Sequence, residues 1–380
     1  MIDLAVPFRE LINVVALAQA LIFAGMLMTG RFREGAASGI LIFTFVIIAT
    51  VKFDQIYQFM GGLDSLPAMG FIFTPVQWLL TPSLYFFVLA KVSRDFRFRR
   101  LDLLHLGPAL VSLIYLSATY FSLPVEDKVA YIQSGTLREP LNALIIPLAS
   151  DLIQLGYLVA AQRVLAAYGV SLRNWTSQID DPDILWARRV LAIWIVAFLG
   201  HILLTLSARV FEQYLLARIV LDLLNVTHLL LINALMVLGI VSQFRVRASL
   251  VGAMGQEKYV GSSQSSADRR SLHERVGREM AENCRFLQMD LSLDELAGLV
   301  EATPRELSEA INGEGGLSFY DFVNQFRVEE AKRLLVEEPE TQILSIAHQS
   351  GFNSKSTFNK VFKIATGQTP SGYRKTTSQD

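Results

Sequence analysis

The chain has 380 residues, of which 52% are hydrophobic and 18% charged, and its formal net charge is −1. Ordinary soluble domains are about 25% charged, so the composition argues against a wholly soluble protein, and the balanced charge does not mark a nucleic-acid binder. A single cysteine, Cys284, excludes an intramolecular disulfide and a zinc finger built on several thiolates. Long apolar runs extend to about Phe244, and the remainder is charged with helical patterning. The sequence therefore predicts one part in lipid and one in water.

Seven apolar segments precede residue 245, and each is long enough to cross a bilayer, which takes about 20 mostly apolar residues. Core helices of soluble proteins rarely follow one another in this way, so we predict a seven-helix transmembrane bundle over residues 1–244. Met1–Glu10 lacks the positive start of a signal peptide, so the first segment is expected to be a retained span. The predicted spans are Leu11–Gly30, Gly35–Val51, Ser65–Ala90, Leu103–Val125, Pro140–Gln162, Val190–Ala208 and Ile219–Phe244.

The Lys/Arg bias of the short loops predicts the orientation of these spans. With the N-terminus outside, the inner loops hold 11 Lys or Arg residues and the outer side holds 6. The densest basic cluster, Arg94–Arg100, is expected to mark an inner loop next to anionic lipid. An odd number of spans then places everything after Phe244 in the cytoplasm, with the lipid bilayer as a partner.

Polar residues within predicted spans five to seven form a candidate sensing layer. At 1.5 Å per residue, Asp151, His201 and His228 fall roughly 12–14 Å below the outer surface, and Asn225 is one turn above His228. Three interpretations stay open: interhelical hydrogen bonds that specify packing, a pocket that senses a small molecule or protons, and a His₂Asp metal site. Nothing local resembles a zinc motif, so no metal and no cofactor are predicted.

Residues 245–271 are rich in Gly, Ser, Gln and Ala, a composition that predicts a flexible cytoplasmic linker. Two capping boxes follow, Ser292–Glu295 and Thr303–Glu306, and Pro304 occupies the first helical position of the second. Two short helices with a tight turn between them predict a helix-turn-helix unit over about 292–312. A longer helix is expected over about 319–336.

The same pattern recurs over about 343–365. Gly351 lies where a left-handed helix stop is needed, and Asn353 or Ser354 can cap the next helix. We therefore predict an all-α chain whose residues 272–380 form a domain with two helix-turn-helix units.

Many residues of this domain fall in register with a known pattern, namely Arg327–Leu335, Ile346–Ala347, Gly351–Phe358, Phe362–Lys363, Gly367–Pro370 and Tyr373–Arg374. Over about Leu291–Lys375 the chain thus resembles the AraC/XylS-type DNA-binding domain. The whole chain resembles membrane-embedded members of that family, in which several spans replace a soluble sensor domain. The resemblance implies a non-enzymatic bacterial transcription factor of the inner membrane, whose two units read successive major-groove segments of double-stranded promoter DNA. A homodimer and a contact with RNA polymerase are further partners that it leaves open.

Recognition helices present their N-terminal residues to base edges, while flanking residues hold phosphates. For Arg374 the resemblance implies a structural or a phosphate contact, and both stay open. The predicted DNA-binding residues are Arg305 and Ser308 in the first unit, Lys355, Ser356, Thr357, Asn359, Lys360 and Lys363 in the second, and Arg374.

The two units differ in charge. Ser271–Glu340 has 7 basic and 16 acidic residues, a net of −9, whereas Thr341–Asp380 has 5 basic and 1 acidic, a net of +4. Glu309 also stands where the resemblance implies a basic or polar contact. The second unit should therefore dominate the electrostatic affinity for DNA, and full binding is expected to need dimerisation or tethering.

Two alternative functions are weighed against a regulator that couples a membrane signal to promoter binding. One is an integral membrane transporter or enzyme with an accessory DNA-binding tail, and the other is a regulator with a passive anchor. The sequence contains no phosphate-binding loop, no spaced Ser/His/Asp set and no internal repeat of the kind common in transporters. The polar residues in spans five to seven argue mildly against a passive anchor.

Overall fold

The computed structural model describes residues 8–29, 35–93, 96–134, 141–177, 182–211, 226–227, 229–230, 232–234 and 265–377. Helices are the regular elements of these ranges, so the all-α prediction is confirmed. The chain divides into two compact units. The first is Met1–Ala166 with Trp186–Val246, and the second is Ala167–Leu185 with Arg247–Asp380.

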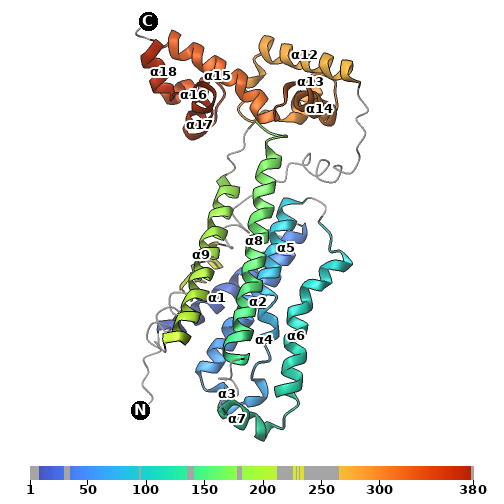
Figure 1. The fold of residues 1–380 in the computed structure, drawn as a ribbon, viewed down its shortest axis with the longest axis vertical. Coiled ribbons are helices and arrows are strands. Elements are labelled where there is room, and N and C mark those ends of the chain that lie inside the picture. Colours follow the sequence, from blue (N-terminus) through green and yellow to red (C-terminus); the bar gives the residue numbers. More distant parts are fainter. Residues whose placement is uncertain are drawn as a thin grey trace. The chain divides into compact units, whose positions relative to one another are not determined.

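The first unit contains long helices and several short ones (Figure 1). They are α1 (Phe8–Met28), α2 (Gly35–Phe59), α3 (Gly62–Ser65), α4 (Thr74–Gln77), α5 (Leu80–Val92), α6 (Gly107–Leu116), α7 (Val125–Gln133), α8 (Ile146–Leu172) and α9 (Pro182–Phe211). Short 3₁₀ turns occupy Pro67–Met69 and Arg100–Leu106, and π-helical turns occupy Ser117–Phe121 and Leu141–Ile145.

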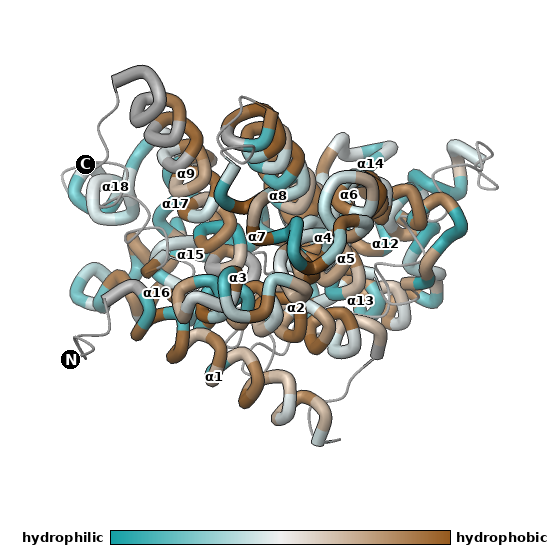
Figure 2. The backbone as a smooth tube through the Cα atoms, turned by 90° about the horizontal axis from the view of Figure 1, so that it is seen from below, coloured by the Kyte–Doolittle hydropathy of each residue, from teal (hydrophilic) through white to brown (hydrophobic). Residues whose placement is uncertain are grey.

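Five helical segments of the described residues are long and apolar enough to cross a membrane. Hydrophobic residues run along α1, α2 and α9 in Figure 2, whereas α12 and α14 of the second unit carry many hydrophilic ones. The count of seven spans stays a prediction, because α9 is not among the five and most of 219–244 lies outside the described residues. The five segments are Glu10–Met28, Ala36–Phe59, Pro67–Val92, Arg100–Phe121 and Ile146–Leu172.

Two helices of the first unit extend beyond their predicted ends. Helix α2 continues beyond Val51 through Lys52, and the structure buries this side chain at 4% exposure. The Lys52 ammonium donates to Asn13 Oδ1 at 3.1 Å and to Gln55 Oε1 at 3.0 Å, and Asn13 donates to Glu10 Oε2 at 3.0 Å. A charge within a span needs such polar partners, so this network explains why α2 does not stop at Val51.

Helix α8 runs to Leu172, ten residues beyond the predicted end at Gln162. Its last residues, from Ala167 onward, belong to the second unit. The chain thus continues directly from an apolar helix of the first unit into the body of the second.

The second unit contains seven helices among its described residues. Helix α12 begins at Ser266, inside the range predicted as linker, because the Ser265 hydroxyl accepts from the Asp268 N–H at 3.2 Å and caps it. The helices are α12 (Ser266–Glu282), α13 (Leu293–Leu299), α14 (Pro304–Gly315), α15 (Phe319–Glu337), α16 (Ile343–Gln349), α17 (Lys355–Thr366) and α18 (Pro370–Thr377).

Two hydrophobic cores share helix α15, which runs between the α12–α14 group and the α16–α18 group (Figure 1). Its N-terminal half places Phe319, Phe322 and Val323 in the first core. Its C-terminal half places Val328, Leu334 and other residues in the second core, with Phe358 and Phe362 of α17. Each helix-turn-helix unit therefore has its own core, and α15 fixes one to the other.

Gly351, between α16 and α17, lies close to the backbone of the segment that follows α12. Its φ is +86°, and a Cβ at this position would lie 2.4 Å from the carbonyl oxygen of Phe286 and 3.0 Å from Leu287 Cα. Both obstacles are backbone atoms, which cannot rotate away as a side chain would. The turn between α16 and α17 thus requires glycine for its conformation and for its contact with the first group.

We expect Gly351→Ala to destabilise the second unit by about 2–4 kcal/mol, the sum of a left-handed backbone penalty and overpacking. Gly316→Ala is the matched control, since Gly316 has φ +62° and nothing within 4 Å of the added Cβ; it should cost about 1–2 kcal/mol. Hydrogen exchange of α15 and α17 amides, in the full chain in lipid nanodiscs, measures both. Equal losses would show that the close approach to Phe286 is absent.

Candidate nucleic-acid interface

Helix α17 separates a buried face from an exposed one. Phe358 and Phe362 are fully buried in the second core, while Lys355, Ser356 and Lys360 are exposed. The helix starts at Ser354, whose hydroxyl accepts the Thr357 N–H at 3.2 Å. Side chains at the N-terminal end of a helix capped in this way are available to a ligand, as in a recognition helix.

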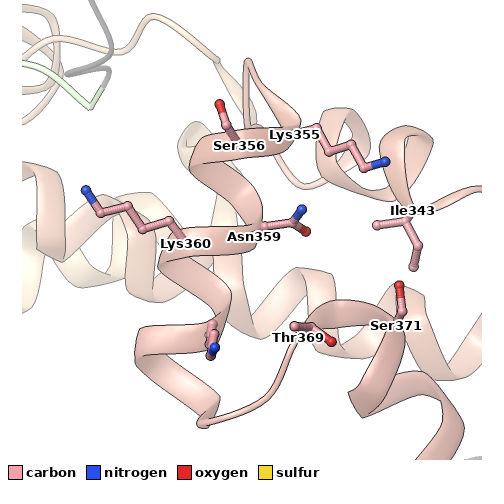
Figure 3. A pocket seen from close by; sticks show the side chains of 8 residues that line it. Ile343, Lys355, Ser356, Asn359, Lys360, Thr369 and Ser371 are labelled. Atoms are coloured by element: carbon pink, nitrogen blue, oxygen red, sulfur yellow. The ribbon is translucent and has the colours of Figure 1, made fainter. Parts of the chain in front are cut away.

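An open depression lies beside the exposed face of α17 (Figure 3). Lys355 and Asn359 point toward Ile343 and Ser371 on its far side, whereas Lys360 projects from the other side of the helix. Three lysines contribute to the lining of this concave surface, and none of its lining residues is acidic. The lining residues are Ile343, Lys355, Ser356, Asn359, Lys360, Lys363, Thr369 and Ser371.

Thr357 differs from the other predicted contacts on α17. Its hydroxyl lies 2.7 Å from Ser354 Oγ, and its backbone N–H is also held by that hydroxyl. The structure thus places Thr357 in the helix cap, and a DNA contact from this residue stays a prediction.

Helix α14, the corresponding helix of the first helix-turn-helix unit, begins with the predicted capping box. Glu306 Oε2 accepts from the backbone N–H and the hydroxyl of Thr303, both at 2.8 Å, and the Thr303 hydroxyl accepts the Glu306 N–H at 3.3 Å. These donors lower the pKa of the Glu306 carboxyl. Glu306 is therefore explained by the helix start.

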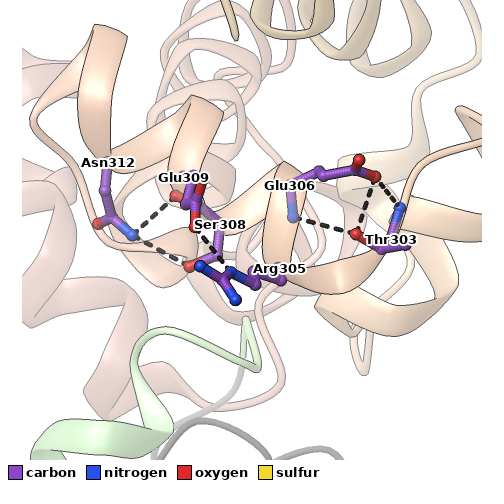
Figure 4. A network of polar contacts seen from close by, with 6 residues as sticks. All are labelled: Thr303, Arg305, Glu306, Ser308, Glu309 and Asn312. Atoms are coloured by element: carbon purple, nitrogen blue, oxygen red, sulfur yellow. Dashed lines mark hydrogen bonds and ion pairs between the residues drawn. The ribbon is translucent and has the colours of Figure 1, made fainter. Parts of the chain in front are cut away.

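The outward residues of α14 are paired with one another (Figure 4). Arg305 Nε donates to Glu309 Oε1 at 2.8 Å, and Asn312 Nδ2 donates to the carbonyl oxygen and the hydroxyl of Ser308 at 2.8 and 3.1 Å. The carboxylate of Glu309 thus offsets the charge that Arg305 would present to a phosphate. This pairing adds a local reason to expect less electrostatic affinity for DNA from the first helix-turn-helix unit than from the second helix-turn-helix unit.

Arg374 on α18 contacts the start of the second helix-turn-helix unit. Its Nη2 donates to the carbonyl oxygen of Thr341 at 2.7 Å, and its side chain is half-buried. Thr341 precedes α16, so this bond joins the last helix to the start of the helix-turn-helix unit. Of the two roles left open by the sequence, the structure favours the positioning one.

The sensing layer lies mostly outside the described residues. Asp151 is 7% exposed on α8. His201 is in α9, but its side chain, Asn225 and His228 are not described. No cluster of three His, Cys, Asp or Glu suited to a metal occurs in the described part of the chain. The layer therefore stays a prediction.

Sequence analysis missed one residue near the interface, Arg327 of α15. It is 2% exposed, and its guanidinium donates to the carbonyl oxygens of Phe286 at 2.7 Å and Gln288 at 2.8 Å. Burial lowers its pKa to about 10, so it remains charged at neutral pH. The available signal was an arginine amid the apolar positions of α15, since Val328 and Ala331 nearby are core residues.

Comparison with known proteins concerns this second unit. A helix-turn-helix domain family matches residues 296–376. An uncharacterized HTH-type transcriptional regulator of Staphylococcus aureus (strain COL) is 39% identical over 95 residues, which are 24% of this chain and 13% of that protein. The HTH-type transcriptional regulator GlxA of Rhizobium meliloti (strain 1021) is 32% identical over 89 residues, 23% of this chain and 27% of that protein.

Among solved structures, the C-terminal domain of AraT, a response regulator from Geobacillus stearothermophilus, is 31% identical. That match covers 30% of this chain and 88% of the other, with a TM-score of 0.25. The chain spans 13% and 27% of the lengths of the two curated relatives, so the similarity concerns the C-terminal domain alone.

If Arg374 positions α18, Arg374→Ala should speed hydrogen exchange in α16 and α18, because a charged donor to Thr341 O contributes about 1.5–3 kcal/mol. Lys375→Ala, an exposed neighbour, is the control and should leave exchange unchanged. An Arg374→Ala chain with normal exchange and a shallower salt dependence of DNA binding would instead assign Arg374 to phosphate.

Proposed function

Because residues 296–376 form an AraC-type helix-turn-helix domain and five long apolar helices precede it, we propose that this chain is a membrane-integrated, one-component transcriptional regulator. It couples a signal at the membrane to sequence-specific binding of promoter DNA. The observation that carries the proposal is the lysine-lined face of α17, exposed within a domain of this family. We propose no enzymatic activity.

A second observation supports the predicted topology. Backbone hydrogen bonds join the segment after α8 to the helix-turn-helix domain, as Leu293 N–H donates to Trp175 O at 3.0 Å. Both must then lie on one side of the membrane, so an even number of crossings separates Ser177 from Ser265. Helix α9 and the predicted span 219–244 supply two crossings, which agrees with seven spans, an outer N-terminus and a cytoplasmic C-terminal domain.

The signal enters the first unit in this proposal. The layer of Asp151, His201, His228 and Asn225 remains our candidate for a small-molecule or proton sensor. A second copy of the chain and RNA polymerase are proposed partners, since the acidic first helix-turn-helix unit contributes few phosphate contacts by itself.

Selection from a random-sequence duplex pool, with the full chain in nanodiscs, tests the function. We expect enrichment of one motif that also occurs in fragments bound in the cell. A transporter or enzyme with an accessory tail predicts no enriched motif. A passive anchor predicts that the motif is bound equally by chains with altered spans, for example Asp151→Asn.

Reporter fusions after Phe244 and within 178–181 test the shared side. A cytoplasmic reporter, such as a fluorescent protein that does not mature outside, should be active at both positions. A fusion within 30–34 should also be cytoplasmic, whereas one within 135–140 should not. A periplasmic phosphatase active after Phe244 would contradict both topology and function, because DNA would be out of reach.

Lys360→Ala and Lys363→Ala should each weaken binding to all duplexes and reduce the slope of log K against log salt by about 0.9, since each lost phosphate contact releases one fewer counterion. Arg305→Ala should have a smaller effect on this slope, because Glu309 already pairs with Arg305. Lys375→Ala serves as the control for loss of one surface charge. An unchanged slope for Lys360→Ala and Lys363→Ala would contradict the proposal that the second helix-turn-helix unit supplies most of the electrostatic affinity for DNA.

A further inference from the structure

The segment Arg173–Ser177, which directly follows α8, is docked on the helix-turn-helix domain; we name it the docking loop. The Tyr320 N–H donates to the carbonyl oxygen of Arg173 at 2.8 Å, and the Ser177 N–H donates to that of Leu291 at 3.1 Å. Together with the bond from the Leu293 N–H to the carbonyl oxygen of Trp175, the Ser177–Leu291 bond forms an antiparallel bridge between Thr176 and Ser292. The loop thus pairs like a short strand with the segment that leads into α13.

Side chains of the docking loop reinforce this pairing. Thr176 and Ser177 are 4% and 2% exposed, and Trp175 packs against the first hydrophobic core. The Arg173 guanidinium lies 5.8 Å from the centre of the Tyr320 ring, within the range of a cation–π contact. A loop held by backbone pairing, an aromatic anchor and a buried hydroxyl is part of the folded domain.

Ser177 also contacts the residue that joins the two helix-turn-helix units. Arg327 Nη2 donates to Ser177 Oγ at 3.1 Å, and Nη1 donates to Ser177 O at 3.3 Å. The same guanidinium lies 5.9 Å from the Phe352 ring centre, and its Nε is 3.1 Å from where a Cβ on Gly351 would stand. Arg327 therefore touches the docking loop, the segment after α12 and the turn that precedes α17.

We propose that the docking loop is the positioning element through which the membrane unit controls DNA reading: Trp175 anchors the loop on the first core, and Ser177 holds Arg327 and thereby the alignment of α14 with α17. This inference rests on the proposed function. Loss of docking leaves Arg327 short of two acceptors and removes Trp175 from the first core. The two recognition helices are then free to depart from the alignment that successive major-groove segments require.

The covalent path favours this route over the long connection that ends at Ser265. The docking loop follows α8 without an intervening residue, so a movement of this helix acts on Ser177 directly. Residues 245–264 lie outside the described residues, and their Gly/Ser-rich composition predicts a linker that transmits little force. A displacement of α8 is therefore transmitted to Arg327 through Ser177 more directly than through the linker.

Variants of the docking loop test the inference in the full chain in nanodiscs, with a duplex selected on the wild-type chain as probe. Ser177→Ala and Trp175→Ala should each raise the Kd for this duplex about tenfold, as expected for a hydrogen bond to a charged group or an aromatic anchor. Both should speed hydrogen exchange around 285–291 and 350–354. Asn174→Ala, whose side chain is exposed in the same loop, is the control and should match wild type.

A disulfide across the bridge provides a test that removes no contact of Arg327. Thr176→Cys and Ser292→Cys, combined with Cys284→Ser to remove the exposed native thiol, place two cysteines at an antiparallel pair close enough to be oxidised. Oxidation should form the cross-link in membranes and leave the Kd for the duplex within about twofold of the reduced protein. The Ser292→Cys single variant controls for loss of the α13 cap.

Three results would overturn the inference, and a different one would overturn the function. Loop variants that bind like Asn174→Ala show that docking does not position the recognition helices. Absence of the cross-link shows that the loop is not docked, and a cross-linked protein that no longer binds shows that docking opposes DNA reading. Failure of the wild-type chain to select any duplex would instead contradict the proposed function.

Discussion

The buried guanidinium of Arg327 is the interaction on which the arrangement of the second unit depends. A cation at 2% exposure is expensive to bury unless its donors are satisfied, and here the acceptors are backbone carbonyls and one hydroxyl from segments before α13 and after α8. Phe286, Gln288 and Met289 belong to the segment between α12 and α13, and Ser177 belongs to the docking loop. The guanidinium therefore joins these two segments, and it also lies beside the ring of Phe352, which follows Gly351.

This arrangement gives the two helix-turn-helix units different tasks on a shared frame. In the first helix-turn-helix unit, the polar residues of α14 pair with one another, and acidic residues outnumber basic ones by nine over Ser271–Glu340. In the second helix-turn-helix unit, lysines of α17 are among the residues that line an open depression. Under the proposed function, we therefore expect the electrostatic attraction to DNA to come mainly from the second helix-turn-helix unit, so that affinity also depends on the alignment of α14 with α17.

Local features of the sequence predicted local structure well. The capping boxes of Ser292 and Thr303 have the predicted partners, because each involves residues three apart along the chain. Contacts between distant residues could not be predicted: Arg327 and Ser177, for example, are 150 positions apart. The burial of Lys52 could not be predicted for the same reason, since its partner Asn13 lies on another helix. The seven spans and the sensing layer rest on hydropathy and depth alone, which do not report packing.

Under the proposed function, the docking loop also changes how a membrane signal would reach DNA. If the C-terminal domain were connected only through a flexible linker, span movements would alter its local concentration or pairing but not its internal geometry. Because Ser177 is 2% exposed within the domain and follows α8 closely, one end of an apolar helix is part of the same folded body as the recognition helices. A small displacement of α8 must then be absorbed either by breaking the Trp175 and Ser177 contacts or by shifting Arg327. Packed cores resist continuous deformation, so such a displacement is converted into a choice between docked and undocked states.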